Sequence, residues 1–370
     1  MFNIIFTSNK RIALSTNAFA HNILQWFETN KRDLPWRNTK NPYIIWLSEI
    51  ILQQTRVAQG LPYFEKFLAN YPTVEDLAAA PSEEIMRLWQ GLGYYSRARN
   101  LHFCAQQVVN EYGGSFPTSY KELLKLKGVG SYTAAAIASF AFDEPVAVVD
   151  GNVFRVLARY FGIATDIASH AGKKEFEVLA NEVLPPSKAG SYNQAIMEFG
   201  ALHCTPNKPN CDTCPLVRSC VAFTNNLVQD LPVKINKVKI KERYFQYYQI
   251  TCGDQVIIRQ RGPKDIWEGL FEFPLVETNQ KEELQLTNKG ILEDLEIIPT
   301  QVVHDSSQVF KHILSHQRIF ANFVRFEFEK AHEEQLKQWA HAQNWQLVSN
   351  ETFENLGKSR LILRYLNGEE

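Results

Sequence analysis

The sequence predicts an all-α region followed by an α+β domain, and two changes of pattern support this prediction. From Asn17 to Phe223, apolar residues recur at three- and four-residue spacing in segments that proline and glycine interrupt, as in amphipathic helices. From about Leu231, apolar and polar residues alternate, as in strands. A third feature, four cysteines between positions 204 and 220, marks the end of the helical region as a candidate metal-binding loop.

Each predicted helix is a segment in which the apolar spacing of a helix continues without a break. In chain order, these segments are 18–29, 42–59, 82–90, 96–112, 119–126, 131–142, 151–161, 173–184 and 192–202. Proline and glycine residues punctuate them, so the first region is predicted to be helical throughout.

The second domain is predicted to begin after a linker. Residues 225–236 are polar and contain proline, which suits a connection between domains, and 244–251 and 255–259 have the composition of strands. We place the second domain at 237–366. The basic run at 234–243 has two interpretations, a contact with a phosphate backbone or a solvated edge strand protected by lysines.

Composition places the chain among globular proteins. Its 370 residues suffice for two or three domains, and 45% hydrophobic residues can form a core in each. No apolar run reaches membrane-spanning length, and Phe2 to Phe6 is followed by Ser8, Lys10 and Arg11 rather than by a signal-peptide core. We therefore expect a soluble, intracellular protein. With a formal net charge of −1, any nucleic-acid surface must be local.

The cysteine pattern predicts a metal or metal cluster. Cys204, Cys211, Cys214 and Cys220 are separated by six, two and five residues. Clustered cysteines in a reducing compartment are more often metal ligands than disulfides, which agrees with the expected intracellular location. Zinc and an iron–sulfur cluster both remain candidates for such a thiolate group.

A glycine hairpin is a candidate phosphate contact. Gly128 and Gly130 flank one apolar residue between two predicted helices, so backbone N–H groups are exposed at the start of the second helix. The helix dipole also favours an anion there. The alternative is an ordinary turn between helices.

Two carboxylates are candidates for acid and electrostatic chemistry. Asp150 ends an apolar run and precedes a predicted helix, where it could also act only as an N-cap. Glu49 lies on a predicted helix among large apolar residues, and burial would raise its pKa so that it could donate a proton at neutral pH. One neutral and one ionised carboxyl group would suit departure of a group from a sugar carbon.

Taken together, these motifs resemble a known family. The hairpin, the segment Val149-Asp150-Gly151-Asn152, the Ser-Glu-x-x-Leu-Gln-Gln-Thr helix around Glu49 and the cysteine spacing resemble the endonuclease III superfamily of DNA glycosylases. The similarity is closest to the MutY-type adenine DNA glycosylases, and it extends from about Asn17 to about Leu366. The motifs occur in the family's order.

The resemblance implies a fold class and a cofactor. It implies an all-α helix-hairpin-helix glycosylase region at 17–224 with an iron–sulfur cluster loop, followed by an α+β Nudix-like C-terminal domain. The helical region would contain a six-helix subdomain at about 32–150 and an iron–sulfur subdomain made of 17–31 and 151–224. In this family the four cysteines hold a [4Fe–4S] cluster.

One position separates two branches of the superfamily. The strand-cleaving branch has a nucleophilic lysine two residues after the second hairpin glycine, and this chain has Tyr132 there. A phenol cannot form a Schiff base, so the resemblance implies a glycosylase without lyase activity. Tyr132 is expected to form a hydrogen bond near Glu49, although a half-buried structural tyrosine is the alternative.

Catalytic roles follow from the resemblance. Glu49 is expected to protonate a flipped adenine at N7, ionised Asp150 to stabilise the oxocarbenium-like sugar, and Asn152 to assist. The other expected DNA-binding residues are Arg37 in the base pocket, Gln54 and Tyr94 entering the helix, and Thr55 and Leu92 at the opposing base. The alternative for the last four residues is that they only pack in the protein core. The alternative for Arg37 is an ordinary surface charge.

The second domain resembles a Nudix fold at 267–274, but the sequence after Pro274 lacks the glutamate-rich helix that holds magnesium in Nudix hydrolases. In the family this domain recognises 8-oxoguanine. Ser315 and His316 match the recognition loop, whereas Leu314 replaces an aromatic residue. Lys127 likewise replaces the usual proline before the hairpin, so that turn is expected to be less rigid.

The sequence therefore predicts a monofunctional adenine DNA glycosylase of base excision repair. Its expected partner is double-stranded DNA with an adenine:8-oxoguanine or adenine:guanine mispair, and we expect a monomer in the bacterial cytoplasm, associated with the nucleoid and not with membranes. The alternatives are an endonuclease III-like glycosylase and lyase, a Nudix nucleotide hydrolase, and a non-catalytic iron–sulfur DNA-binding or electron-transfer protein.

Overall fold

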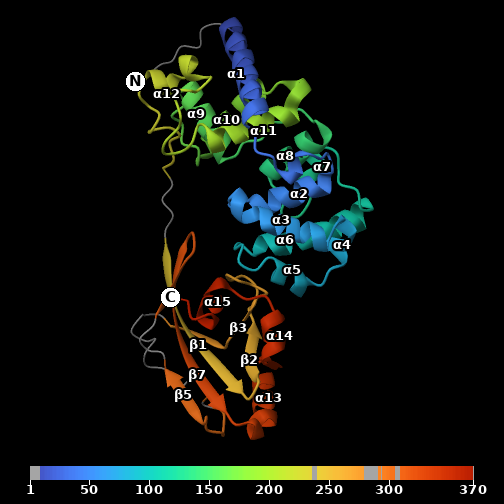
Figure 1. Ribbon diagram of the computed structural model, residues 1–370, viewed down its shortest axis with the longest axis vertical. Coiled ribbons are helices and arrows are strands. Elements are labelled where there is room, and N and C mark those ends of the chain that lie inside the picture. Colours follow the sequence, from blue (N-terminus) through green and yellow to red (C-terminus); the bar gives the residue numbers. More distant parts are fainter. Residues whose placement is uncertain (1–8, 236–239, 279–290, 293, 305–308, 370) are drawn as a thin grey trace. The chain divides into compact units, whose positions relative to one another are not determined.

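The computed structural model describes residues 9–235, 240–278, 291–292, 294–304 and 309–369, with the backbone alone at 9–16 and 304 (Figure 1). The chain divides into two compact units. The first comprises the described residues within Met1–Ala78 and Phe103–Asn236, and the second those within Ala79–His102 and Lys237–Glu370. The boundary between the predicted linker and second domain, at 236 and 237, lies outside the described residues, as does the 236–239 part of the basic run. The proposed subdomains stay a prediction.

The first unit is helical, which confirms the predicted class of this region. Its elements are α1 (Asn9–Asn30), η1 (Pro35–Arg37), α2 (Pro42–Leu52), α3 (Val57–Asn70), most of α4 (Val74–Ala79), the latter part of α6 (Ser96–Tyr112), α7 (Tyr120–Leu123), α8 (Ser131–Phe142), α9 (Gly151–Phe161), α10 (His170–Val183), η2 (Pro186–Lys188), α11 (Ala189–Leu202), η3 (Val217–Ser219) and α12 (Val221–Thr224).

The prediction of a single helix at 42–59 is wrong. The chain forms α2 and α3 instead, with a turn at 53–56. Gln54 in this turn has a φ of 55°, in the left-handed region that ends a right-handed helix. The apolar spacing continues through the turn because both helices have a buried face, so spacing alone does not reveal the break. The helix predicted at 119–126 is also shorter, because α7 ends at Leu123.

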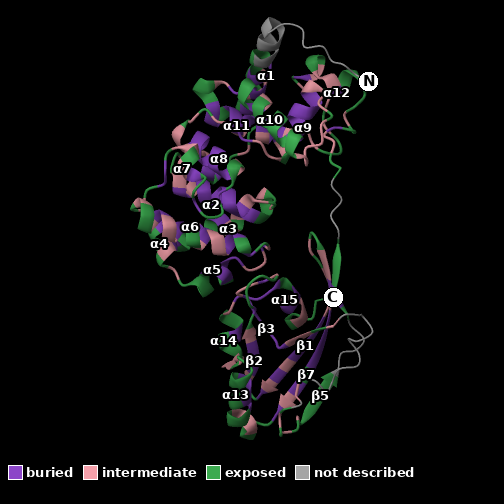
Figure 2. Ribbon diagram, turned by 180° about the vertical axis from the view of Figure 1, so that it is seen from behind, coloured by how far each residue is buried: buried purple, intermediate pink, exposed green. Residues whose placement is uncertain are grey.

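A hydrophobic core joins α1, α9, α10 and α11. It contains Phe19, Leu157, Phe176, Tyr192 and Phe199, all essentially without solvent exposure. Figure 2 shows buried residues along α2 and α8 as well, and these two helices pack against each other. The helices that carry the predicted carboxylates are therefore fixed by packing on several sides, which limits side-chain motion in the candidate site.

The second unit contains a mixed eight-stranded sheet with the order β3-β2-β1-β7-β5. Outside this path, β4 pairs with β1, β6 with β7, and β8 with β2. The strands are β1 (Lys241–Cys252), β2 (Gln255–Gln260), β3 (Phe271–Glu272), β4 (Leu275–Thr278), β5 (Gln301–His304), β6 (Phe310–Ile313), β7 (Gln317–Phe328) and β8 (Gln346–Ser349). The helical elements are α5 (Ser82–Leu88), the start of α6, η5 (Lys330–His332), α13 (Glu333–Ala342), α14 (Asn350–Asn355) and α15 (Arg360–Leu366).

Parallel pairing of β1 and β7 forms the centre of the sheet, with Lys241 opposite Gln317 and Cys252 opposite Phe328. A core of Tyr248, Ile257, Phe326 and Leu336, among others, lies against this pair. Figure 1 shows α13 and α14 alongside the sheet, where they contact β8 and, for α14, β2. The predicted strands at 244–251 and 255–259 and the α+β class are confirmed.

Candidate active site

Glu49 lies on a helix that is almost entirely buried. Asn41 caps the start of α2 by accepting a hydrogen bond from the Tyr43 N–H, and Pro42 occupies the first turn, where a missing N–H has no cost. The following residues are apolar on every face, so the helix carries Glu49 into the interior, where it is 5% exposed. The prediction that Glu49 has apolar surroundings is confirmed.

The environment of Glu49 favours its neutral form. Burial raises its pKa to about 7, because the charged form loses hydration, and the charge of Asp150 raises the pKa as well. The Tyr132 hydroxyl donates a hydrogen bond to Glu49 Oε2 over 2.7 Å, and this bond opposes the rise, as does Arg37. The expected hydrogen bond between Tyr132 and Glu49 is thus confirmed. A carboxyl group of this pKa is divided between its two protonation states near neutral pH.

Asp150 is the N-cap of α9. Its Oδ1 accepts hydrogen bonds from the N–H groups of Asn152 and Val153 over 2.9 and 2.8 Å, and its Oδ2 accepts one from the Asn152 amide over 2.7 Å. The predicted N-cap is confirmed as local structure. The geometry also assigns Asn152 a definite contact, since its side chain holds the second carboxylate oxygen.

The two carboxyl groups differ in what surrounds them. Burial raises the pKa of Asp150 too, but the hydrogen bonds from Val153 and Asn152 and the charge of Arg155 lower it. N–H donors stabilise the ionised form of a carboxylate, and Glu49 receives none from the backbone among the hydrogen bonds of the described residues. The pKa of Asp150 is still raised overall by burial, but its hydrogen bonds favour the ionised form more than the surroundings of Glu49 do.

A buried glutamate that sequence reasoning missed organises the nearby arginines. Glu198, on α11, is 1% exposed and accepts bidentate hydrogen bonds from both Arg32 and Arg37 at distances between 2.5 and 3.0 Å. Burial alone would raise the pKa of Glu198, but these arginines lower it to about 2. Arg37, predicted to line a pocket, is thus an ion-paired residue and not a free surface charge. The only sequence signal for Glu198 was a carboxylate within an apolar helix.

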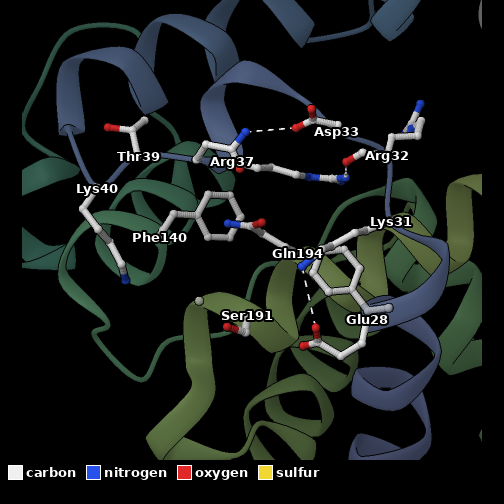
Figure 3. A pocket seen from close by; sticks show the side chains of 13 residues that line it. Glu28, Lys31, Arg32, Asp33, Arg37, Thr39, Lys40, Phe140, Ser191 and Gln194 are labelled. Atoms are coloured by element: carbon white, nitrogen blue, oxygen red, sulfur yellow. Dashed lines mark hydrogen bonds and ion pairs between the residues drawn. The ribbon is translucent and has the colours of Figure 1, made fainter.

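A cavity of about 380 Å³ lies beside this group (Figure 3). Arg32, Arg37, Phe140, Gln194 and Lys40 are among the residues that line it. Of the predicted site residues only Arg37 is in the lining, so this cavity does not enclose Glu49 and Asp150.

The glycine hairpin has the predicted form. Gly128 has a φ of 77°, which a residue with a side chain rarely adopts, and Gly130 is the N-cap of α8. A side chain at Gly130 would meet open space, with no atom within 4 Å. The glycine therefore leaves the first turn of α8 accessible to a ligand, as a phosphate contact requires. Lys127 is exposed, and its N–H donates to Gln107.

Four predicted DNA-contacting residues lie at turns. In the first unit, Gln54 is exposed in its left-handed turn, and Thr55 N–H donates to Leu52. In the second unit, Tyr94 is 42% exposed with a φ of 49°, whereas Leu92 is 5% exposed, which favours core packing for Leu92.

The predicted recognition loop is a hairpin between β6 and β7. Ser315 and His316 are exposed there, and the Leu314 N–H donates to Gln317. The Ser315 hydroxyl forms a hydrogen bond with the Tyr94 hydroxyl, so the structure brings together two side chains that the sequence predicted separately.

The four clustered cysteines are free thiols in one partly buried environment. Burial raises the pKa of Cys214 to about 12, and the charges of Cys204, Cys220 and Cys211 raise it as well. Three of the four pack against the core of α1, α9, α10 and α11. In the part of the chain that the structure describes, no three His, Cys, Asp or Glu side chains form a ready-made site for a single metal ion.

A second missed residue connects the cysteine loop to Asp150. Arg155 donates to the carbonyls of Cys204 and Gly200 over 2.7 and 2.6 Å and to Asn152 Oδ1 over 2.9 Å. Gly200 permits this close packing, since a side chain there would come within 2.6 Å of Asn152. The guanidinium therefore fixes the amide that holds Asp150. A lone arginine at helical spacing gave no sign of this contact.

Comparison with known proteins places this geometry in a family. Residues 47–186 match the model of the HhH-GPD superfamily of base excision DNA repair proteins, and residues 246–368 match the NUDIX domain. Among the described helices, none is long and apolar enough to span a membrane.

Similar proteins extend over most of the chain. An adenine DNA glycosylase of Buchnera aphidicola (subsp. Schizaphis graminum) is 36% identical over 80% of this chain and 84% of its own length. The mouse enzyme of the same name is 35% identical over 80% of this chain and 68% of its length.

Solved structures resemble about three fifths of the chain. A thermostable thymine-DNA glycosylase matches 59% of this chain and all of its own chain, with 34% identity and a TM-score of 0.54. A non-covalent endonuclease III–DNA complex matches 60% of this chain and 99% of its own, with 25% identity and a TM-score of 0.51. The expected family is thereby confirmed: the chain belongs to the MutY-type adenine DNA glycosylases, with a helical HhH-GPD region followed by a C-terminal NUDIX domain.

Proposed function

We propose that this protein removes adenine opposite 8-oxoguanine or guanine in double-stranded DNA, by hydrolysing the N-glycosidic bond. The observation that carries the proposal is Glu49, a buried carboxyl group with a pKa of about 7 and a hydrogen bond from Tyr132. The charge of Asp150, the hydrogen-bonded N-cap of α9, acts on it. The adenine DNA glycosylases to which the chain is similar support the choice of base.

The chemistry proceeds in two stages. Adenine leaves poorly as an anion, so Glu49 donates its proton to the flipped base, which departs neutral while the sugar becomes oxocarbenium-like. Asp150 stabilises that positive charge, and Asn152 keeps its carboxylate oriented. Water then adds its oxygen to the sugar carbon and gives a proton to Glu49, which restores the acid.

Lyase activity is the second candidate function, since an endonuclease III–DNA complex is similar to 60% of this chain. Strand cleavage by that route needs an amine that attacks the sugar. Tyr132 occupies the corresponding place and its hydroxyl is engaged with Glu49. A buried phenol whose pKa lies well above its usual value, raised first by burial, is not a nucleophile at neutral pH.

Single-turnover assays on duplexes with adenine opposite 8-oxoguanine, guanine or thymine test the function. We expect adenine release from the first two, with strand breaks only after alkali treatment, because the abasic product is left intact. Borohydride should trap no covalent DNA adduct. Strand breakage before alkali treatment, or a covalent adduct trapped by borohydride, would show that the protein is a lyase and would contradict the proposed glycosylase without lyase activity.

We further propose that Cys204, Cys211, Cys214 and Cys220 hold a [4Fe–4S] cluster. The donor set fits, because four thiols share one environment without a disulfide among them. When bound, the cluster would hold the loop 204–220 as a cross-link. Through Arg155, that loop orients Asn152 and thus Asp150, so loop order matters for catalysis. A zinc ion held by the same four cysteines is the alternative.

Metal analysis of the purified protein separates these possibilities. We expect about four iron and four sulfide per chain, with broad visible absorbance. Cys214→Ser should lose most of the iron and adenine release together, whereas Cys104→Ser, which changes a buried cysteine outside the loop, should retain both. One zinc per chain and no sulfide would contradict the cluster assignment.

The NUDIX domain is proposed to read the base opposite adenine through Ser315 and His316, which are exposed at the hairpin tip. Because its sequence lacks the magnesium-binding helix, nucleotide hydrolysis is not proposed. We also propose that the protein acts as a monomer in the bacterial cytoplasm, on nucleoid DNA.

A further inference from the structure

The segment that carries Leu92 and Tyr94 is an irregular loop within the second unit. Between α5 and α6, left-handed φ angles occur at Gly91, Gly93 and Tyr94, with values of 95°, 77° and 49°. For a tyrosine this conformation is strained. Such a loop lacks the regular hydrogen bonds of a helix, so contacts from elsewhere must hold its shape.

The turn at Lys358 supplies one set of contacts. Its N–H donates to Gln90 Oε1 over 2.9 Å, and its carbonyl accepts a hydrogen bond from the Tyr95 hydroxyl over 3.3 Å. These contacts lie at the two ends of the irregular loop. The side chain of Lys358 fixes the turn itself, because the buried ammonium donates to the carbonyl of Glu354 in α14 over 3.1 Å and to that of Leu356 just after the helix over 2.8 Å.

A second set of contacts comes from the NUDIX signature. Arg99, in the first turn of α6, donates to the Glu268 carbonyl over 2.7 Å and forms an ion pair with its carboxylate over 3.2 Å. Backbone packing is also close, since a side chain at Gly357 would lie 3.3 Å from the backbone of Met86. Contacts of the 357–358 turn and of Glu268 therefore hold both ends of the loop and the two helices, α5 and α6, that flank it.

These contacts orient the loop toward the recognition hairpin. The Tyr94 hydroxyl meets that of Ser315, and the Arg97 guanidinium lies 5.6 Å from the Tyr94 ring. A residue that enters DNA beside a lesion must keep a fixed distance from the group that reads the lesion, and small displacements are costly.

We propose that Gln90 and Arg99 are positioning residues that fix the 89–95 loop to Lys358 and Glu268, so that Tyr94 and Ser315 read the base opposite adenine as one unit. The inference rests on the proposed function and adds that preference for 8-oxoguanine depends on this attachment. Excision itself, which depends on Glu49 and Asp150 in the other unit, does not require it.

A charge exchange tests the attachment. We expect Arg99→Glu and Glu268→Arg each to lower the single-turnover rate on adenine:8-oxoguanine by about tenfold, because the loop loses its position. The rate on adenine:guanine should change less than about twofold, since that pair offers no lesion contact to lose. The double variant restores an ion pair of opposite polarity and should recover most of the preference. Arg325→Glu, which breaks an exposed ion pair elsewhere in the unit, is the matched control.

The outcomes separate this inference from the function on which it rests. Equal wild-type rates on the two mispairs would refute lesion recognition, and the inference with it. A wild-type preference that both single variants retain would refute the inference alone, as would equal losses on both mispairs. Hydrogen exchange gives a second measurement: exchange in 89–95 should accelerate in the single variants and return toward wild type in the double variant. Unchanged hydrogen exchange at 89–95 in the single variants would also refute the inference that Arg99 positions this loop.

Discussion

Replacing Glu49 by glutamine is expected to reduce adenine release by about 100- to 10,000-fold in single-turnover assays, the range for loss of a general acid. The amide has nearly the shape of the carboxyl group and can still accept the 2.7 Å hydrogen bond from Tyr132. It cannot donate an acidic proton. Because the fold loses no buried volume, thermal stability should change little, and DNA binding should persist.

The pH dependence distinguishes an acid from a structural glutamate. Burial is the main reason that the pKa of Glu49 is raised to about 7. The reactive protonated form of Glu49 therefore dominates below pH 7 and is lost as the pH rises through that value. The wild-type rate should therefore fall about tenfold per pH unit above pH 7. The residual rate of Glu49→Gln should be flat across this range.

Glu65→Gln is a suitable control, since Glu65 is exposed on α3 in the same unit. Its rate and pH profile should match those of the wild type. A Glu49→Gln enzyme that excises adenine at the normal rate, or a wild-type profile without a decline above pH 7, would remove Glu49 from the mechanism.

The sequence predicted the helices that carry the site because their signals are local. The helices at 131–142 and 151–161 begin and end where the structure places α8 and α9. Each follows a residue whose chemistry suits a helix start, and Asp150 was identified both as a cap and as a candidate site residue. A side chain that serves local structure and chemistry together is visible at both levels.

The missed features depend on partners distant in sequence. Glu198 is recognisable only once Arg32 and Arg37, more than 150 residues earlier, lie against it. Arg155 likewise acquires its role from Cys204 and Gly200. The turn at Gln54 was missed for a different reason: glutamine has no special preference for left-handed backbone, so nothing in the local sequence interrupts the helical spacing.

Replacing Asp150 by asparagine separates its two roles. Asparagine is as good an N-cap as aspartate, so its oxygen can still accept from the N–H groups of Asn152 and Val153. It carries no charge to stabilise the cationic sugar. We expect a loss of about 100- to 1,000-fold in single-turnover adenine release, comparable to removal of a preorganised electrostatic contact, with a change in unfolding free energy below about 1 kcal/mol.

The matched control is a cap without a catalytic role. Ser169 caps α10 by accepting from the Gly172 N–H over 2.9 Å. Ser169→Ala should lower stability by about 1 kcal/mol and leave the excision rate unchanged. If Asp150→Asn instead excised adenine at the wild-type rate, Asp150 would act only as a helix cap, and its charge would have no part in bond cleavage. Activity lost at full stability requires the acceptor oxygen and negative charge at Oδ2, because the amide preserves only the two backbone hydrogen bonds that Oδ1 accepts from α9.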